Sequence, residues 1–171
     1  GTPVCEDAWH PDVAEALAES GAQILVVPNG SPYARGRFDT RMWHMVARVV
    51  ETELPMAYLN TVGGQDDQVF DGASFVLNPG GALTHLAPGF VEHVMHVDFD
   101  ETPEGWRARP GERAPMPEDL ERDYHAMVLG TQAYLKKSGF SKVVLGLSGG
   151  VDSALVATIA GLKARGTTII W

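Results

Sequence analysis

Residues 145–153, with the sequence Leu-Gly-Leu-Ser-Gly-Gly-Val-Asp-Ser, constrain the fold of this chain more than any other stretch. The Lys-Val-Val-Leu run at 142–145 is typical of a buried parallel strand, and the Ala- and Leu-containing residues 154–160 favour a helix. A strand that turns through glycines into a helix leaves free backbone N–H groups at the positive end of the helix dipole. The stretch therefore predicts an α/β fold with an anion site at this turn.

The side chains of the turn indicate which anion it binds. The residues predicted to bind the phosphates of a nucleotide are Ser148, Gly149, Gly150, Val151, Asp152 and Ser153. The two glycines let the backbone approach an anion closely, and the two serines add hydroxyl donors. A carboxylate beside a phosphate is repulsive unless a divalent cation lies between them, so Asp152 predicts bound Mg²⁺. A serine-capped glycine turn without a ligand is the alternative, and the strand-to-helix context favours the nucleotide.

The Ser-Gly-Gly-x-Asp-Ser pattern resembles the pyrophosphate loop of enzymes that split ATP between its α and β phosphates. No Lys follows the glycines, so this is not the Walker pattern. The resemblance implies an enzyme that adenylylates an oxygen of its substrate and lets ammonia displace AMP. It identifies a superfamily and leaves the substrate open.

Composition limits the classes of protein to which the chain can belong. Its 171 residues can bury one good core or two incomplete ones, and 44% hydrophobic with 20% charged residues is ordinary for a soluble globular protein. A net charge of −9 argues against nucleic acid as the main partner. The single cysteine excludes an internal disulfide and fits a reducing compartment. With no signal peptide and no apolar run that could span a membrane, we expect a cytoplasmic protein.

The order of the expected elements predicts two domains. The chain is expected to contain helices from Pro11 to Gly21 and around 42–50, and extended segments at 23–27, 56–59, 69–70 and 74–77. This order describes the later half of a layered α/β domain, which we place at 1–97. Residues 98–117 are rich in Pro, Gly, Glu and Arg without periodicity and predict a linker. A second domain then covers 118–171. The first residues read as the end of a strand and the last as the middle of one, so we expect a piece that spans the junction of two domains.

Cys5 is the only thiol, and Glu6 and Asp7 follow it directly. Most free cysteines are small buried hydrophobes, and neighbouring carboxylates disfavour a thiolate. Local chemistry alone therefore favours a structural residue. A reactive Cys5 would need a cation from elsewhere in the fold.

Four segments together are similar to the nitrilase-type glutaminase domain of the glutamine-dependent NAD⁺ synthetases. They are Cys-Glu-Asp-Ala-Trp at 5–9, Asn-Gly-Ser-Pro-Tyr at 29–33, Gly-Gly-Gln-Asp-Asp at 63–67 and Phe-Asp-Gly-Ala-Ser-Phe at 70–75. In that family a linker and a synthetase domain with the Ser-Gly-Gly-x-Asp-Ser loop follow in the same order. The resemblance extends to about Ala160. It implies the C-terminal part of a nitrilase-like αββα sandwich, followed by the start of a Rossmann-like adenine nucleotide alpha-hydrolase (PP-loop) domain.

The resemblance also implies roles for single residues. Cys5 matches the nucleophile of a Glu-Lys-Cys triad whose Glu and Lys would lie upstream of Gly1. Ser31 and Arg37 match a Ser and a Lys that hold glutamine, and Arg for Lys keeps the charge while changing the geometry. Ammonia released from glutamine would pass through a tunnel to the second site. There ATP and Mg²⁺ would activate nicotinic acid adenine dinucleotide for conversion to NAD⁺, in a protein that is a homo-oligomer when intact.

Two other interpretations stay open at this point. Another ATP-splitting amidotransferase, such as a GMP synthetase or an asparagine synthetase, would share the pyrophosphate loop but pair it with a glutaminase that 1–97 does not fit. A non-catalytic α/β piece, whose motifs are present while their partners are missing, is the interpretation that we favour for the 171 residues acting alone.

Overall fold

The computed structural model describes residues 1–161 and 168–170. Its helical elements are η1 (Cys5–Trp9), α1 (Pro11–Glu19), α2 (Arg37–Thr52), η2 (Pro79–Gly81), α3 (Asp119–Lys137) and α4 (Val151–Gly161). Its strands are β1 (Leu25–Asn29), β2 (Met56–Asn60), β3 (Val62–Gln65), β4 (Gln68–Asp71), β5 (Phe75–Asn78), β6 (Ala82–Leu86), β7 (Phe99–Thr102), β8 (Gly105–Ala108), β9 (Val144–Gly146) and β10 (Thr168–Ile170). The predicted α/β class is confirmed.

Two compact units make up the chain, and each is described by itself. One unit comprises Gly1–Val62 and Phe70–Pro117, and the other comprises Gly63–Val69 and Glu118–Trp171. No helix in the described residues is long and apolar enough to cross a membrane.

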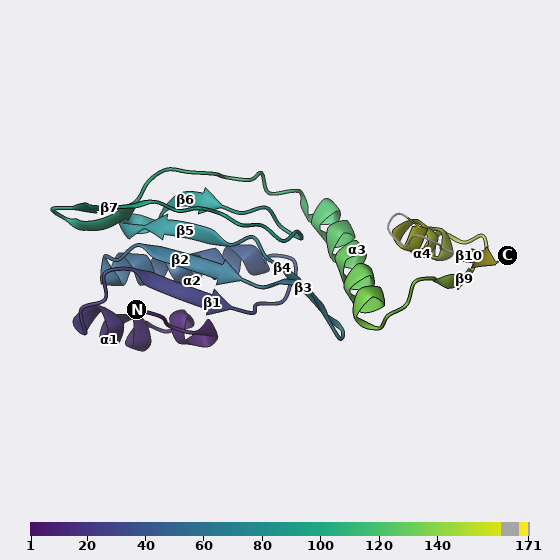
Figure 1. Ribbon diagram of the computed structural model, residues 1–171, viewed down its shortest axis with the longest axis horizontal. Helices are drawn as coiled ribbons and strands as arrows, with labels where there is room; N and C mark the ends of the chain where they lie inside the picture. The colour runs from purple at the N-terminus through teal and green to yellow at the C-terminus, as the bar shows by residue number, and fades with distance from the viewer. Residues whose placement is uncertain (162–167, 171) are drawn as a thin grey trace. The chain divides into compact units, whose positions relative to one another are not determined.

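A four-stranded sheet in the order β1-β2-β5-β6 forms the centre of the first unit (Figure 1). β1 and β2 are parallel, with Val27 opposite Tyr58 and Asn29 opposite Asn60, and the other neighbours are antiparallel. Helix α2 connects β1 to β2. Because parallel strands end at the same edge, the segments that follow Asn29 and Asn60 leave the sheet side by side.

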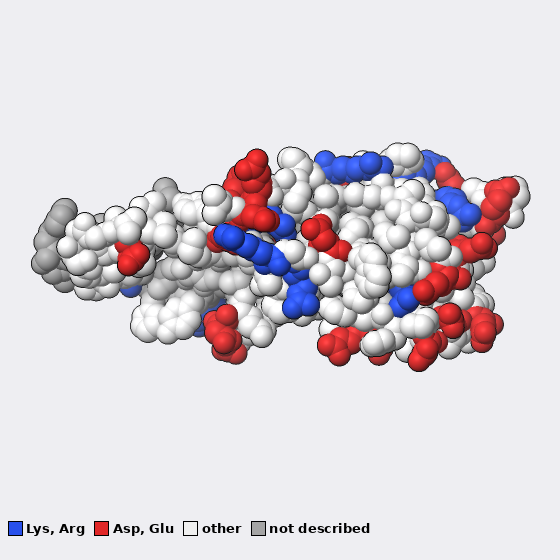
Figure 2. Space-filling view, turned by 180° about the vertical axis from the view of Figure 1, so that it is seen from behind, with Lys and Arg blue, Asp and Glu red and all other residues white. Residues whose placement is uncertain are grey.

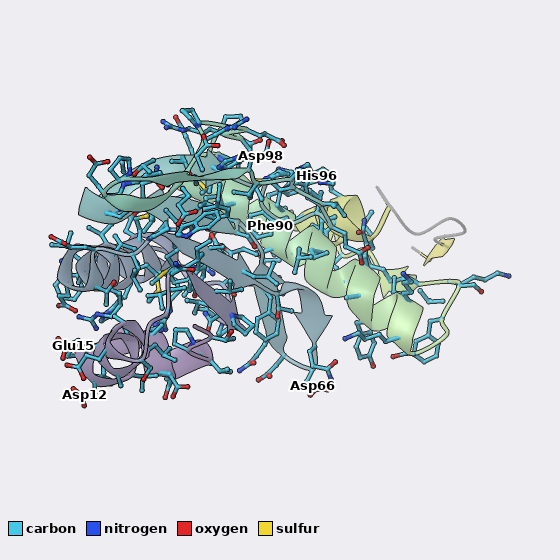
Figure 3. All side chains as sticks on the ribbon, turned by 60° about the vertical axis from the view of Figure 1, so that its left-hand side comes forward. Asp12, Glu15, Asp66, Phe90, His96 and Asp98 are labelled. Carbon is cyan, nitrogen blue, oxygen red and sulfur yellow. The ribbon has the colours of Figure 1, made fainter. Side chains whose placement is uncertain are left out.

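The core of this unit lies between the sheet and α2. Alternate residues of the strands turn toward the helix, and Met45 and Val49 of α2 meet them with no exposed surface. The strand residues of this cluster include Leu25, Val27, Met56, Tyr58, Phe75 and Leu77. Helix α1 packs beside α2 and turns Asp12 and Glu15 outward (Figure 3). The segment before Cys5 and the loop after Asn29 are both attached to this layer of sheet and helix.

The chain before Cys5 is extended, as the sequence predicts, although it is not one of the strands. The N-terminal amino group of Gly1 donates to the Ile24 carbonyl at 2.7 Å, and the Val26 N–H donates to the Gly1 carbonyl at 2.8 Å. These bonds anchor the segment beside β1 and so fix where the following turn begins.

Residues 98–117 depart from the predicted linker, because they contain the β7–β8 hairpin and belong to the first unit. The Asn78 side chain accepts from the Ala108 N–H at 2.8 Å and donates to the Ala108 carbonyl at 2.9 Å. Beyond the hairpin, Leu86 exchanges backbone hydrogen bonds with Glu112 and Ala114. Such partners, distant in sequence, order a segment whose composition by itself resembles a loop.

The second unit is built on α3 and the β3–β4 hairpin, with Asp66 at the hairpin tip (Figure 3). A Cβ added at Gly64 would lie 2.9 Å from the Cβ of Ala133, so the hairpin backbone rests directly on the helix. Lys137 Nζ donates to the Gly64 carbonyl at 2.7 Å and to Gln65 Oε1 at 2.6 Å. The Gly-Gly-Gln-Asp-Asp segment is therefore a helix-docking hairpin.

Strand β9 also differs from the sequence prediction of a buried strand. It pairs in parallel with β10 alone in the described part of the chain, and Val144 is 67% exposed. Helix α4 is mostly apolar, yet Val151, Leu155 and Val156 are exposed. A parallel strand becomes buried only when neighbouring strands and covering helices are present, and two strands cannot supply them.

Charges of both signs alternate over the surface. On the face shown in Figure 2, the Lys and Arg side chains of the described residues are interspersed with Asp and Glu.

Candidate functional site

Cys5 opens the η1 turn in a strained backbone conformation. It is half-buried, with φ at +55°, a region that residues with a Cβ rarely adopt. The Asp7 carboxylate accepts from the Val4 N–H at 3.1 Å, and the Asp7 N–H donates back to the Val4 carbonyl at 3.1 Å. Glu6 is exposed. Asp7 therefore closes the turn that begins at Cys5, and Glu6 faces solvent.

Helix α2 anchors the far end of this turn. Arg48 Nη1 donates to the Trp9 carbonyl at 2.8 Å, and the same guanidinium forms two 2.7 Å bonds with Glu51. The Trp9 ring stacks on His44 with centroids 4.6 Å apart. Burial, followed by the charges of Arg48 and His10, lowers the pKa of His44. A neutral imidazole is therefore favoured at this contact.

Tyr58 lies in the core beneath the Cys5 turn. Its hydroxyl accepts a hydrogen bond from Asn29 Nδ2, and its ring stacks on Phe75 at 4.7 Å. Burial is the main cause that raises the pKa of Tyr58 to about 12, while Cys5 and Asp71 also lie within electrostatic reach of the hydroxyl. Cys5 thus lies near Tyr58, the middle residue of β2.

This shift predicts a separate titration step for Tyr58. Because its folded pKa is raised, the associated stability is present below about pH 10 and is lost as the pH rises toward about 12. Four tyrosines contribute to the tyrosinate absorbance. We expect wild-type protein and Tyr58→Phe to titrate alike up to about pH 11 and to differ above it. In denaturant the difference should move to about pH 10. A difference already at pH 10 in folded protein would contradict the assignment.

Ser31 follows β1, and side chains hold its backbone. It is 6% exposed, and its N–H donates to Asn60 Oδ1 at 2.9 Å. Its carbonyl accepts from Asn60 Nδ2 at 3.3 Å and from Arg41 Nη1 at 3.5 Å. Arg37, the second residue predicted to hold glutamine, begins α2 directly after Gly36, whose φ is +74°. The two predicted residues thus bracket one loop.

The charged residues at this loop were not predicted from sequence. Arg41 carries no signal beyond its place one turn after Arg37, and Asp71 was only part of a matching motif. Asn60 ends β2 without any local pattern that marks it. The asparagines at the ends of two predicted parallel strands, together with an Arg in the intervening helix, could have suggested a polar cluster.

The pyrophosphate loop has the predicted context of strand, glycine turn and helix. Gly149 has φ at +83°, and α4 begins at Val151. Ser148 Oγ lies 3.2 Å from Ser153 Oγ, so the two hydroxyls face each other across the turn. Ser153 Oγ also donates to the Gly150 carbonyl at 3.0 Å. Asp152 lies in the first turn of α4 and is exposed. No group of three metal-ligating side chains occurs among the described residues.

A cavity of about 420 Å³ lies on the other face of the sheet and is mostly apolar. Val26, Ala57, Leu59 and Val76, which point away from α2, contribute to its lining. None of the predicted site residues lines this cavity. Asn60, which bonds to Ser31, is one of its lining residues.

Two protein families match this chain, one over the segment that contains Cys5 and one over the segment that contains the glycine turn. The carbon–nitrogen hydrolase family matches residues 1–108, which includes the β7–β8 hairpin, and the NAD synthase family matches residues 123–167. The glutamine-dependent NAD(+) synthetase of Rhodobacter capsulatus is 64% identical over 94% of this chain, and that of Acinetobacter baylyi is 38% identical over 94%. The chain spans 29% of the length of each of these relatives.

Solved structures agree with the sequence relatives. The glutamine-dependent NAD⁺ synthetase from Acinetobacter baumannii, solved in complex with ADP, superimposes with a TM-score of 0.89 at 36% identity. The match covers 99% of this chain and 32% of that one. A carbon–nitrogen hydrolase from Helicobacter pylori matches 54% of this chain, and 37% of its own, with a TM-score of 0.51 at 25% identity. The resemblance seen in the sequence is confirmed: the chain belongs to the carbon–nitrogen hydrolase family, its residues 123–167 match the NAD synthase family, and as a whole it is similar to the glutamine-dependent NAD⁺ synthetases.

Proposed function

We propose that the full-length protein is a glutamine-hydrolysing NAD⁺ synthase, an ATP-dependent amide ligase. The observation that carries the proposal is the union, in one chain, of a strained Cys5 turn and a Ser-Gly-Gly-x-Asp-Ser turn. Both lie in segments that match relatives of that name in the same order. Its substrates are small molecules: glutamine, ATP and nicotinic acid adenine dinucleotide.

In the first reaction Cys5 is the nucleophile. Its sulfur attacks the side-chain amide carbon of glutamine, the C–N bond breaks, and ammonia leaves after gaining a proton. Water then cleaves the thioester and releases glutamate. The backbone strain at Cys5 fixes the direction of the sulfur, while Ser31 and Arg37 hold the substrate from one loop. The general base and the activating cation are the Glu and Lys that the family implies upstream of Gly1.

In the second reaction the turn between Ser148 and Ser153 holds the phosphates of ATP. The open space at Gly149, where an added Cβ would have no neighbour within 4 Å, and the facing serine hydroxyls suit a phosphate. The carboxylate of nicotinic acid adenine dinucleotide attacks the α-phosphorus and releases pyrophosphate. Ammonia then attacks the activated carboxyl carbon and releases AMP, which yields NAD⁺.

Asp152 is the residue that would hold Mg²⁺. One exposed carboxylate suits this cation, which is often bound by one or two carboxylates, phosphate oxygens and water. When bound, the cation neutralises charge on the phosphates. The single cysteine suits a reducing cytoplasm, and a homo-oligomer is the assembly that the family resemblance favours.

The test is to give the purified full-length protein ATP, Mg²⁺ and nicotinic acid adenine dinucleotide with either glutamine or ammonia. We expect NAD⁺, AMP and pyrophosphate in equal amounts from both nitrogen sources, and glutamate from glutamine only. Product formation with the acceptor of another amidotransferase in place of the dinucleotide would favour that alternative. ATP cleavage without any product from the dinucleotide would contradict the proposal.

A further inference from the structure

Arg41 and Asp71 form a buried ion pair next to the Ser31 loop. Arg41 Nη1 and Nη2 donate to the two carboxylate oxygens of Asp71 at 2.8 and 2.7 Å, and the side chains are 1% and 2% exposed. Removing two charges from water is costly, so such a pair is weak evidence for stability. The pair is therefore more informative about the residues that it holds in place than about stability.

Asn60 connects this ion pair to the backbone of Ser31. Its Oδ1 accepts from the Ser31 N–H at 2.9 Å, and its Nδ2 lies 3.3 Å from the Ser31 carbonyl, 3.3 Å from Asp71 Oδ1 and 3.1 Å from the Gly72 carbonyl. Side chains thus bind both backbone polar groups of Ser31. Asn60 belongs to β2 and Arg41 to α2, and Asp71 at the end of β4 accepts from both, so their positions are set by the packed core.

We propose that Asn60, Arg41 and Asp71 are positioning residues that fix the Ser31 loop for binding glutamine. The inference rests on the proposed function. A loop fixed in advance loses little conformational freedom when the substrate binds, so the network should strengthen substrate binding. None of the three residues takes part in the chemistry at Cys5. Their loss should therefore raise KM for glutamine more than it lowers kcat.

The main variant is Asn60→Ala in the full-length protein. It removes both contacts with the Ser31 backbone while leaving the ion pair intact, so no charge is buried alone. We expect KM for glutamine to rise at least about tenfold and kcat to change less than about threefold. NAD⁺ formation from ammonia should stay at the wild-type rate, which also reports that the protein is folded.

Two further variants separate positioning from stability. Asp71→Asn keeps the shape and removes the charge, and it should raise KM while also lowering Tm, because Arg41 stays buried without its partner. Val49→Ala is the control variant, and Val49 lies on α2, the helix that carries Arg41. Val49 is fully buried in the core cluster, so its truncation should lower Tm and leave KM for glutamine unchanged.

The possible outcomes are distinct. A wild-type KM in Asn60→Ala, or in Asp71→Asn if the first variant does not fold, overturns the positioning role. An equal rise of KM in Val49→Ala also overturns it, because general loosening would then suffice. Wild-type protein that hydrolyses no glutamine overturns the proposed function itself, and the inference with it.

Discussion

Replacing Cys5 with Ala is expected to separate the two proposed activities completely. Glutamine hydrolysis and glutamine-driven NAD⁺ formation should fall at least about a thousandfold, because no neighbouring group can replace the thiolate as nucleophile. NAD⁺ formation from added ammonia should continue at the wild-type rate, because ammonia is the product that Cys5 chemistry supplies. The two rates are measured on one preparation, with glutamate and NAD⁺ as separate readouts.

Glu6→Gln is the matched control for this variant. Glu6 is adjacent to Cys5 in sequence but exposed, whereas the turn is closed by the Asp7 carboxylate. It should retain glutamine-driven synthesis within about twofold, in line with most exposed substitutions. Glutaminase activity that survives Cys5→Ala would mean that another group is the nucleophile.

Replacing Asp152 with Asn is expected to produce the opposite pattern. The change keeps the size of the side chain and removes the charge that would hold Mg²⁺, so NAD⁺ formation should fall about ten- to hundredfold with either nitrogen source. Glutamine hydrolysis should continue, because Asp152 lies outside the Cys5 chemistry. Raising the Mg²⁺ concentration should restore part of the lost rate by mass action.

Asp66→Asn, at the tip of the β3–β4 hairpin, supplies the control for a lost negative charge in the same unit. It should leave the rate of NAD⁺ formation unchanged with either nitrogen source. If Asp152→Asn makes NAD⁺ from ammonia at the wild-type rate, the role proposed for Asp152 is wrong.

Local patterns in the sequence predicted the elements whose causes are local. The glycines and small residues at 148–153 require a turn between strand and helix, and Gly149 indeed has a positive φ. Apolar periodicity likewise predicted the helices that became α1 and α2. The family resemblance supplied the candidate roles of Cys5 and Ser31, which no local pattern contains.

Tertiary structure alone decided the contacts between residues far apart in the chain. The β7–β8 hairpin forms in a segment with a loop-like composition because Asn78, 30 residues away, bonds to both backbone groups of Ala108. Arg41 and Asp71 are likewise separated by 30 residues, and sequence gives an ordinary surface charge no sign that it will be buried. The sequence by itself therefore determined the glycine turn at 148–153, to which we assign ATP binding. The packed core decided how Ser31 is held, because hydrogen bonds to its backbone exist only once α2, β2 and β4 have come together.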